Sequence, residues 1–386
     1  MKVLITGGAG FIGSEIVEQL SNKTGFEVVV LDNLSPQIHS NNPKDSYLYN
    51  KINGKCQFIR GDIRDLNMMC EAVNECEYII HLAAETGTGQ SMYRINQYND
   101  VNIMGTSTLF QALSDTKSPI KKIVLASSRS VYGEGKYQCK SHGVFYPEGR
   151  SKSDMEQGDY KMHCPVCGQN MLPLPTDEES KIYPLSLYAF TKYAQEKMIE
   201  TMCKALDINY TIFRLQNVYG KGQSLSNPYT GILSIFSERM LQNADINIFE
   251  DGQESRDFIH VIDVARAFIQ SLENTETNSK ILNLGSGKNT SVLEVAQLLR
   301  DNYGSLSVLN ITGDFRIGDI AHNMADMTIT EKLLNFKPQI NLLKGLEDFS
   351  KWVRLEGGKE LKYEESLHEM KQAGLFISKK TERRTS

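Results

Sequence analysis

Short apolar segments alternate with longer amphipathic segments over the first third of the chain. The apolar runs predict strands at residues 2–6, 27–31, 57–60, 78–82 and 122–126. Apolar residues repeat at helical spacing in residues 14–20 and 102–113, which predicts helices between the strands. Strands that alternate with helices are typical of a parallel sheet with right-handed crossovers. We therefore expect an α/β fold built on a doubly wound parallel sheet.

The later part of the chain changes its pattern twice. Residues 134–183 are polar and rich in proline and show no periodicity, which indicates an insertion before a helix at residues 188–206. A strand at residues 210–215 follows, with shorter sheet segments expected at residues 255–264 and 281–284. These segments predict a smaller, mixed α/β C-terminal substrate domain that interleaves with the first.

The expected domain boundaries follow from these changes. Residues 1–217 form the cofactor domain with its insertion, residues 218–353 form the substrate domain, and residues 255–285 partly return to the first domain. Residues 354–386 are highly charged; we expect a helix over residues 361–372 and a disordered basic tail from residue 378.

Composition narrows the possible functions of the chain. It has 386 residues, 40% hydrophobic and 23% charged, which suffice for a sizeable core without disulfides. A net charge of -5 and a pI near 5.9 give no sign of the basic patch that nucleic-acid binding requires, and they argue against binding to a membrane surface. No apolar run is long enough to span a bilayer, and the short apolar N-terminus runs directly into a glycine loop. We expect a cytoplasmic enzyme.

A glycine loop follows the first predicted strand. Gly7, Gly10 and Gly13 give the spacing G-x-x-G-x-x-G, which permits a tight turn, a close approach to a pyrophosphate and close helix packing. The N-terminus of the following helix offers free N–H groups to phosphates. Asp32 closes the second strand, where a carboxylate accepts hydrogen bonds from a ribose diol and repels a 2′-phosphate. The sequence therefore predicts a Rossmann-type domain that binds NAD in preference to NADP.

A tyrosine and a lysine lie four residues apart on the predicted helix 188–206. Tyr188 and Lys192 share a helix face, and an ammonium beside a phenol favours the phenolate, a general base. The segment Ser127–Gly133 follows the fifth strand, where open α/β sheets bind their ligands, and a serine hydroxyl there hydrogen-bonds a substrate oxygen. By itself the tyrosine–lysine pair is also compatible with a plain helix surface.

The insertion carries two short, matching metal-ligand motifs. Cys139 and His142 lie three residues apart, as do Cys164 and Cys167, and a glycine follows each pair. Four thiolate or imidazole ligands in paired loops are typical of tetrahedral zinc. Because all four positions are filled by protein, this zinc site is expected to be structural; His163 is an alternative ligand. Three free cysteines and an unrelated histidine remain the competing interpretation.

The order of motifs resembles the extended short-chain dehydrogenase/reductase family of NAD-dependent nucleotide-sugar epimerases and dehydratases. The motifs that carry the resemblance are TGGAGFIG, GDIRD, HLAAE, VNIMGT, SSRSVYG, YAFTK and RDFIHVIDVA, within residues 1–134 and 183–353. The resemblance implies that Tyr188 is the base, that Lys192 assists it and that Ser128 completes the catalytic triad. It further implies tightly bound NAD held by Gly7, Gly10, Phe11, Ile12, Gly13, Asp32, Asn33, Asp62, Ile63, Leu82, Ala83, Ala84, Asn102, Tyr188 and Lys192.

The same resemblance implies a site for the nucleotide sugar. Ser128 and Ser130 lie at the sugar, Asn217 binds the phosphates, and Arg256 with Arg316 and Asp319 holds the pyrophosphate and nucleotide ribose. Two arginines suit a pyrophosphate because the guanidinium fork matches phosphate oxygens. A salt bridge from Arg256 to Asp257 or Asp263 is the competing interpretation, as a loop cap is for Asp62.

Two residues distinguish among the reactions of this family. Dehydratases resemble one another in an Asp-Glu pair before Val-Tyr-Gly, and Arg129 and Ser130 occupy those positions here. The sequence therefore favours a 4-epimerase, an isomerase that inverts C4 through a transient 4-keto sugar. The insertion and residues 226–232 resemble a branch acting on dTDP-L-rhamnose and its C4 epimer, dTDP-6-deoxy-L-talose.

Alternatives remain open at this point. They are a UDP-sugar 4-epimerase, a reductase of 4-keto nucleotide sugars, a decarboxylase and an inactive nucleotide-sugar-binding homologue. The helices at residues 102–113 and 188–206 resemble the pair that forms a four-helix interface in the family, so we expect a homodimer.

Overall fold

A seven-stranded parallel sheet forms the centre of the molecule. The structure is a computed structural model that describes residues 1–39, 41–225, 231–356 and 363–378. Its strands follow the order β13-β9-β5-β4-β1-β2-β3, and every pairing between them is parallel. The strand order reverses between β1 and β4, and open α/β sheets bind their ligands at the carboxyl ends of the strands at such a switch point. The expected α/β, Rossmann-like sheet is confirmed.

The strands are buried on both faces, which explains their continuous apolar runs. They are β1 (Lys2–Thr6), β2 (Glu27–Asp32), β3 (Gln57–Arg60), β4 (Tyr78–His81), β5 (Lys122–Ser128), β9 (Asn209–Leu215) and β13 (Lys280–Leu284).

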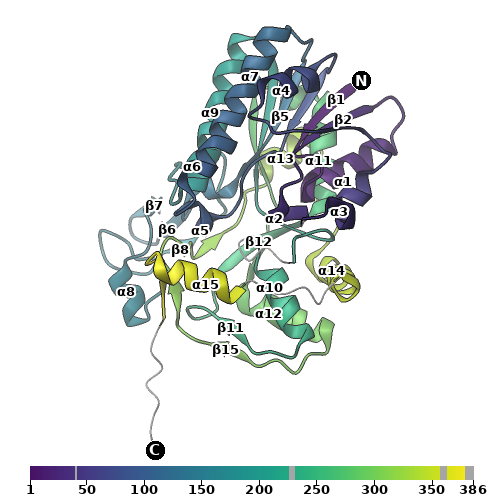
Figure 1. The fold of residues 1–386 in the computed structure, drawn as a ribbon. Helices are drawn as coiled ribbons and strands as arrows, with labels where there is room; N and C mark the ends of the chain where they lie inside the picture. Colours follow the sequence, from purple (N-terminus) through teal and green to yellow (C-terminus); the bar gives the residue numbers. More distant parts are fainter. Residues whose placement is uncertain (40, 226–230, 357–362, 379–386) are drawn as a thin grey trace, which may run out of the picture.

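Helices cover both faces of this sheet. On one face α1 (Phe11–Ser21) packs against α11 (Val261–Glu273), and α13 (Thr328–Leu334) contacts β13. On the other face lie α4 (Leu66–Val73), α7 (Gly105–Thr116) and α9 (Leu187–Ala205) (Figure 1). Short helical segments link these elements: α2 (Pro36–His39), η1 (Pro43–Asp45), α3 (Tyr47–Ile52), α5 (Thr88–Ser91), α6 (Ile95–Tyr98), η3 (Arg129–Tyr132) and η4 (Thr275–Thr277).

Two predicted elements differ from those in the structure. Only the first part of residues 255–264 is a strand, because α11 begins at Val261 with His260 as its N-cap. Buried residues at Val261, Val264, Ala265 and Phe268 follow helical spacing, so the apolar run there belongs to a helix. The helix expected from residue 102 begins earlier, as a π-helical segment η2 (Asn99–Met104) that leads into α7.

A second region packs beneath the carboxyl ends of the main sheet. Its four-stranded mixed sheet contains β10 (Asn217–Tyr219), β12 (Ser255–His260), β14 (Asn289–Ser291) and β17 (His322–Asn323). A separate apolar core, which includes Phe236, Leu299 and Trp352, joins three helices. These helices are α10 (Ile232–Leu241), α12 (Val292–Tyr303) and α14 (Leu342–Glu356), beside the strand pair β11 (Ile246–Ile248) and β15 (Leu309–Ile311).

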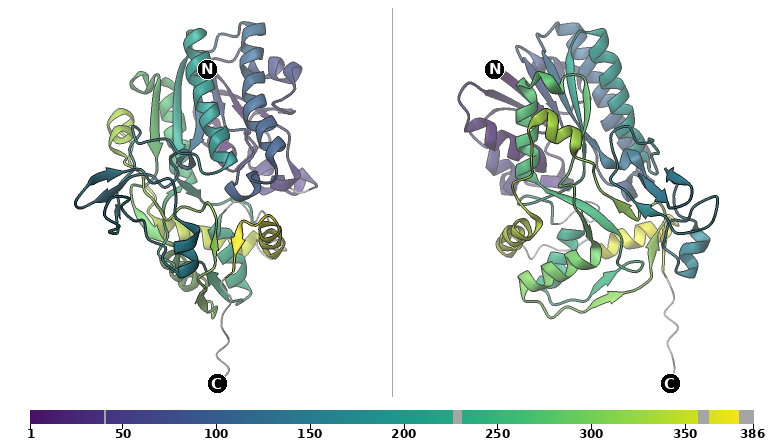
Figure 2. Two further views of the ribbon diagram at one scale, coloured as in Figure 1. Left: turned by 90° about the vertical axis from the view of Figure 1, so that its left-hand side faces the viewer. Right: turned by 180° about the vertical axis from the view of Figure 1, so that it is seen from behind.

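The insertion folds into a small unit of its own. An antiparallel sheet joins β7 (Gly143–Phe145), β6 (Tyr137–Cys139) and β8 (Leu172–Pro173), and the short helix α8 (Lys152–Gln157) follows β7. A small core of Tyr137, Met162, Met171 and two cysteines lies inside it. Figure 2 shows this unit projecting from the side of the molecule.

The C-terminal segment returns to the second region. Helix α15 (Tyr363–Gln372) precedes β18 (Phe376–Ile377), which pairs antiparallel with β16 (Phe315–Arg316). The expected helix thus largely forms, although residues 361–362 lie outside the described residues, as do residues 379–386 of the expected tail. Among the described helices, none combines the length and the apolar character needed to cross a membrane.

Candidate functional site

One cavity of about 490 Å³ lies at the carboxyl ends of the main strands, between the sheet and the second region. It is lined by nearly all of the expected cofactor residues: Gly7, Gly10, Phe11, Ile12, Gly13, Asp32, Asn33, Asp62, Ile63, Leu82, Ala83, Ala84, Tyr188 and Lys192. Ser128, Ser130 and Asn217 line the same cavity. The fold thus brings together Gly7 and Asn217, which are 210 positions apart in the sequence.

The N-terminus of α1, at the end of the glycine loop, lines this cavity and has no side-chain cap. Gly10 is the N-cap of α1 and supplies no side-chain acceptor, and the first turn of α1 carries no acidic residue. A Cβ on Gly13 would lie 2.4 Å from the carbonyl oxygen of Gly7, so only glycine permits this close approach. The uncapped helix end favours an anionic group.

Asp32 lies at the end of β2 and is nearly buried. Its carboxylate accepts hydrogen bonds from the N–H groups of Ala9 (3.0 Å) and Leu34 (2.8 Å). Burial raises the pKa of Asp32, and these two hydrogen bonds oppose the rise. The carboxylate thereby braces the glycine loop as well as lining the cavity.

Asp62 follows β3 and forms an ion pair with Arg64 at 2.8 Å. It also accepts a hydrogen bond from the side chain of Asn33 (3.2 Å). The hydrogen bond from Arg64 is the main cause that lowers the pKa of Asp62 to about 2. The carboxylate therefore caps its loop, the alternative that the sequence left open, while it also lines the cavity.

Ser128, Tyr188 and Lys192 meet inside the cavity. Ser128 is the last residue of β5, and the side chain of Ser186 caps the N-terminus of α9, which carries the other two. The amide of Tyr188 donates to Oγ of Ser91 (3.0 Å), and Nζ of Lys192 donates to the carbonyl oxygen of Ala126 (2.9 Å). The end of β5 thus anchors the lysine beside the serine.

The electrostatics of Tyr188 differ from the sequence-based expectation. Burial raises the pKa of Tyr188, and the groups that oppose the rise are the hydroxyl of Ser128 and the charge of Arg129. Burial also lowers the pKa of Lys192 to about 7. In the protein alone, Arg129 therefore supplies positive charge that the sequence analysis had assigned to Lys192.

Four expected ligand-binding residues lie outside the cavity lining. The side chain of Asn102 is occupied, because it bonds to the backbone of Glu85 and to Oγ1 of Thr191 (2.9 Å). It therefore links the loop after β4 to α9. The other three are Arg256, Arg316 and Asp319.

Arg256 makes neither of the salt bridges that the sequence left open. Its guanidinium donates to the carbonyl oxygens of Ser255, Ile320 and Ala321, each at 2.9 Å. Arg316 and Asp319 form an ion pair at 2.7 Å. These contacts gather all three residues around the turn at residues 316–321.

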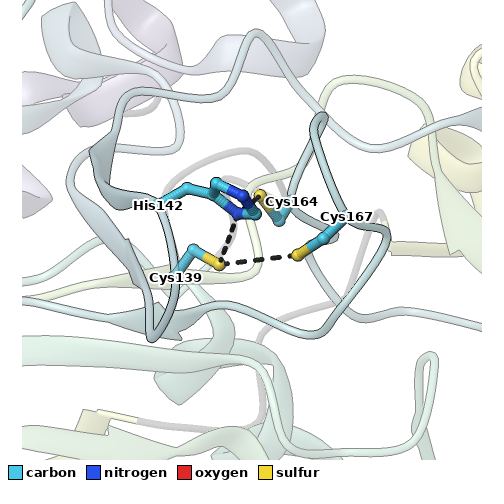
Figure 3. A group of neighbouring side chains, drawn as sticks. All are labelled: Cys139, His142, Cys164 and Cys167. Atoms are coloured by element: carbon cyan, nitrogen blue, oxygen red, sulfur yellow. Dashed lines mark hydrogen bonds between the residues drawn. The ribbon is translucent and has the colours of Figure 1, made fainter.

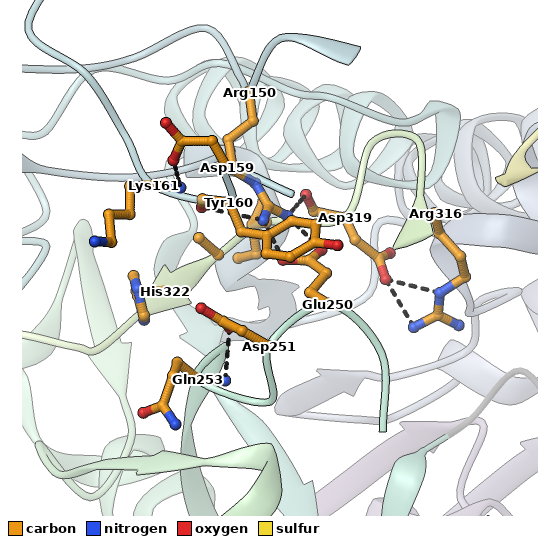
Figure 4. Close-up of polar contacts among 12 residues, drawn as sticks. Arg150, Asp159, Tyr160, Lys161, Glu250, Asp251, Gln253, Arg316, Asp319 and His322 are labelled. Atoms are coloured by element: carbon orange, nitrogen blue, oxygen red, sulfur yellow. Dashed lines mark hydrogen bonds and ion pairs between the residues drawn. The ribbon is translucent and has the colours of Figure 1, made fainter. Parts of the chain in front are cut away.

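A buried ion cluster joins the insertion to this turn (Figure 4). The side chain of Arg150 is 2% exposed; it pairs with Glu250 and donates to the carbonyl oxygen of Asp319 (2.8 Å). Glu134, whose side chain is fully buried, lies 3.5 Å from Nε of Arg150 and accepts the N–H of Ala321 (2.9 Å). The insertion thereby holds the backbone that carries Asp319.

The four expected metal ligands of the insertion converge in space (Figure 3). The ligand atoms of Cys139, His142, Cys164 and Cys167 all lie within 4.8 Å of one another. Sγ of Cys139 is 3.6 Å from Nδ1 of His142 and 3.7 Å from Sγ of Cys167. Sγ of Cys164 is 3.7 Å from the same imidazole nitrogen.

The local backbone explains this convergence. The glycine after each ligand pair adopts positive φ, +82° at Gly143 and +70° at Gly168, which turns each loop back on itself. The alternative ligand His163 lies outside the cluster. Its two ring nitrogens contact the side chain of Asp159 (2.8 Å) and the carbonyl oxygen of Gly168 (3.2 Å).

The family model for the NAD dependent epimerase/dehydratase family matches residues 3–149 and 165–285. These ranges cover more than half of the chain and contain the glycine loop, Ser128, Tyr188 and Lys192. The chain belongs to the NAD dependent epimerase/dehydratase family.

Individual relatives match almost the whole chain. A dTDP-L-rhamnose 4-epimerase from Burkholderia thailandensis is 37% identical over 92% of this chain and 95% of its own length. The solved UDP-glucose 4-epimerase of Thermotoga maritima, in complex with UDP-glucose, has a TM-score of 0.74 at 28% identity, covering 92% of this chain and 99% of that one. A solved complex with UDP-glucuronic acid and NAD has a TM-score of 0.71 at 27% identity, with coverage of 92% and 100%.

Two cavity residues of this family member escaped the sequence analysis as ligand-binding candidates. Gln216 lines the cavity beside Asn217, and neither polar atom of its side chain has a partner among the described residues. Arg129 lines it beside Ser128, although its sequence position indicated only a departure from the Asp-Glu pair of dehydratases. Their positions at the ends of β9 and β5 were the available signal, since open α/β sheets bind ligands there.

Proposed function

We propose that this chain is an NAD-dependent 4-epimerase of a nucleotide sugar. The observation that carries the proposal is the single cavity shared by the glycine loop, Asp32 and the three residues Ser128, Tyr188 and Lys192. Membership of the epimerase/dehydratase family and the 4-epimerase names of its relatives support it. Arg129 and Ser130 stand where dehydratases of the family resemble one another in an Asp-Glu pair, which favours epimerisation.

The first region fits NAD on structural grounds. The uncapped N-terminus of α1 suits a pyrophosphate, and the side chain of Asp32 lies at the end of β2, where a ribose diol binds. The cofactor-binding residues expected from the sequence would hold the dinucleotide, with Asn102 supporting the loop behind it. When bound, NAD accepts the hydride of the sugar carbon and returns it.

Three side chains carry the proton chemistry in this proposal. Tyr188 takes the proton of the sugar 4-hydroxyl and gives it back after the keto sugar has turned over. Ser128, which hydrogen-bonds Tyr188, also binds the reacting oxygen. Lys192 holds the nicotinamide ribose and adds positive charge to that of Arg129, which favours the phenolate.

The substrate is assigned to a nucleotide sugar bound between the two regions. Ser130 lies at the sugar, Asn217 at the phosphates, and the turn that carries Arg316 and Asp319, held by Arg256, at the pyrophosphate and ribose. In this division residues 1–217 with 255–285 bind NAD, and residues 218–353 bind the nucleotide sugar.

We favour dTDP-L-rhamnose and dTDP-6-deoxy-L-talose as the substrate pair. The Burkholderia thailandensis relative is named a dTDP-L-rhamnose 4-epimerase, and it matches 92% of this chain. Most of the segment 226–232 that resembles this branch lies outside the described residues, except Gly231 and Ile232.

We further propose that the four-residue cluster of the insertion binds one structural zinc ion. Tetrahedral zinc, with Zn–S bonds of about 2.3 Å and Zn–N bonds of about 2.0 Å, places two sulfur atoms about 3.8 Å apart and a sulfur and a nitrogen about 3.5 Å apart. The separations of 3.6 and 3.7 Å in the cluster fit these values. With four protein ligands no position is left for substrate, so the ion stabilises the fold of the insertion.

A homodimer through α7 and α9 completes the proposal. Apolar side chains on and beside these helices are exposed, with Phe190 at 52% and Met104 at 55%. A second copy of the same helix pair would cover them.

A substrate panel tests the proposed function directly. The purified protein is incubated with dTDP-, UDP- and GDP-sugars without added cofactor, and the products are resolved by stereochemistry. We expect C4 epimers at a mixture reached from either side, and C4 without deuterium in heavy water, because the hydride returns from the cofactor. Deuterium at C4 or a strict need for added NADPH would contradict the proposal, whereas turnover of UDP-sugars alone would change only the substrate.

A further inference from the structure

Arg129 lies between the catalytic residues and the proposed phosphate site. It follows Ser128 directly, its positive charge acts on Tyr188, and its Nε donates to Oδ1 of Asn217 (3.2 Å). All four residues line the same cavity. Arg129 therefore lies alongside the space that a substrate must occupy between its reacting carbon and its phosphates.

In the contact between Arg129 and Asn217 the arginine donates and the amide oxygen accepts. An arginine has five N–H donors and no acceptor, so the atom of Asn217 that it contacts must be the carbonyl oxygen. The amide of Asn217 then presents its NH₂ group, and the terminal nitrogens of Arg129 add further donors. Two side chains that together offer N–H donors and positive charge favour an oxyanion.

The charge of Arg129 also lacks a carboxylate partner in ion-pair contact within the part of the chain that the structure describes. Its side chain donates instead to the neutral amide of Asn217. Burial and the neighbouring charge of Arg256 lower the pKa of Arg129 to about 9, although the more distant carboxylates of Asp319 and Glu134 oppose the change. A partly buried guanidinium that lacks a carboxylate in direct contact is costly, and a bound anion offsets both the burial and the repulsion by Arg256.

We infer that Arg129 is a substrate-binding residue that, together with Asn217, binds an oxyanion of the nucleotide sugar. The inference rests on the proposed function, since it assigns a new contact within the same site. Two groups of such a substrate have this chemistry: the β-phosphate, and a carboxylate on the sugar. The position of Asn217 favours the β-phosphate.

Binding to the NAD-loaded enzyme tests this inference without relying on turnover. Dissociation constants are measured by calorimetry for UDP, dTDP, UMP, dTMP and UDP-glucuronate with the wild type, Arg129→Met and Arg129→Lys. Arg300→Gln serves as the matched control, because Arg300 lies on α12 and outside the cavity lining. NAD content and thermal unfolding report whether each variant is folded.

We expect Arg129→Met to weaken diphosphate binding roughly 10- to 100-fold, the scale of a charge-assisted hydrogen bond, and to leave monophosphate binding within about 2-fold. Arg129→Lys should recover part of the loss. A loss confined to UDP-glucuronate would support the carboxylate in place of the β-phosphate. Equal affinities of the wild type and Arg129→Met for all probes, or an equal loss for mono- and diphosphates, would overturn the inference. A wild type that binds none of the probes would overturn the proposed function as well.

Discussion

Tyr188 shows how the surroundings of one side chain decide its chemistry. The phenol lies in a buried setting that raises its pKa, while Ser128 and Arg129 oppose the rise. Lys192 reaches the carbonyl oxygen of Ala126 and has a pKa near 7, so its charge depends on pH and on what binds nearby. We therefore expect the base to be fully active only when cofactor and substrate complete the site.

The substitution Tyr188→Phe should abolish the proton transfer and leave the cavity intact. We expect turnover to fall at least ~10²-fold, the usual scale for a general acid–base group, with NAD content unchanged. Tyr193→Phe is the matched control, because Tyr193 lies on the same helix but not in the cavity lining. Near-normal turnover of the Tyr188 variant would remove the residue from its assigned role.

At the scale of elements, the insertion connects the proposed metal-ligand cluster to the turn that we propose binds substrate. Its sheet has only three short strands and a small core, so few apolar contacts hold it together. The side chain of Arg150 extends from this unit, pairs with Glu250 and donates a hydrogen bond to the backbone carbonyl of Asp319. Loss of the metal should therefore affect substrate affinity as well as local stability.

Metal analysis of the purified protein should find about one zinc ion per chain. Cys164→Ser should lose most of the zinc, lower the thermal midpoint and raise KM more than it lowers kcat, because metal binding and local folding are linked. Cys70→Ser removes a thiol outside the cluster and should change none of these quantities. A metal-free wild type of unchanged stability would refute the zinc assignment.

Across the whole molecule, buried histidines couple folding to pH. His81 lies in the core of the sheet between Thr6 (2.7 Å) and Thr106 (3.0 Å), and burial lowers its pKa to about 3. Burial likewise lowers the pKa of His39 and of His322 to about 4. The unfolded chain binds these protons from about pH 6.5 downward, whereas the folded protein does not, so stability falls as the pH falls.

Urea unfolding at pH 7 and pH 5 measures this coupling. By linkage His81 alone should cost about 2 kcal/mol of unfolding free energy between these pH values. His81→Asn should reduce the difference by about that amount, while His368→Gln, which removes an exposed histidine, should leave it unchanged. An identical pH dependence in the wild type and the His81 variant would contradict the assignment of a neutral, buried imidazole.

The sequence by itself determined the parts whose signal is local. These parts are the strand–helix alternation, the glycine spacing with Asp32, the Tyr188–Lys192 pair and the two metal-ligand motifs. Each of them can be recognised from residues that lie close together in the sequence. Backbone geometry then fixes their immediate structure, as the positive φ of Gly143 and Gly168 illustrates.

Only the tertiary structure decided which distant residues meet. The strand β13 joins the main sheet beside β9, and β18 pairs with β16, the strand that carries Arg316. In both cases the backbone N–H and C=O groups of the strand find their hydrogen-bond partners only in a segment that is distant in the sequence. Arg129 and Arg150 acquire their partners across intervals of 88 and 100 residues. Charge alone predicts that such side chains remain in solvent; the cavity and the buried ion cluster exist only once the chain has folded around them.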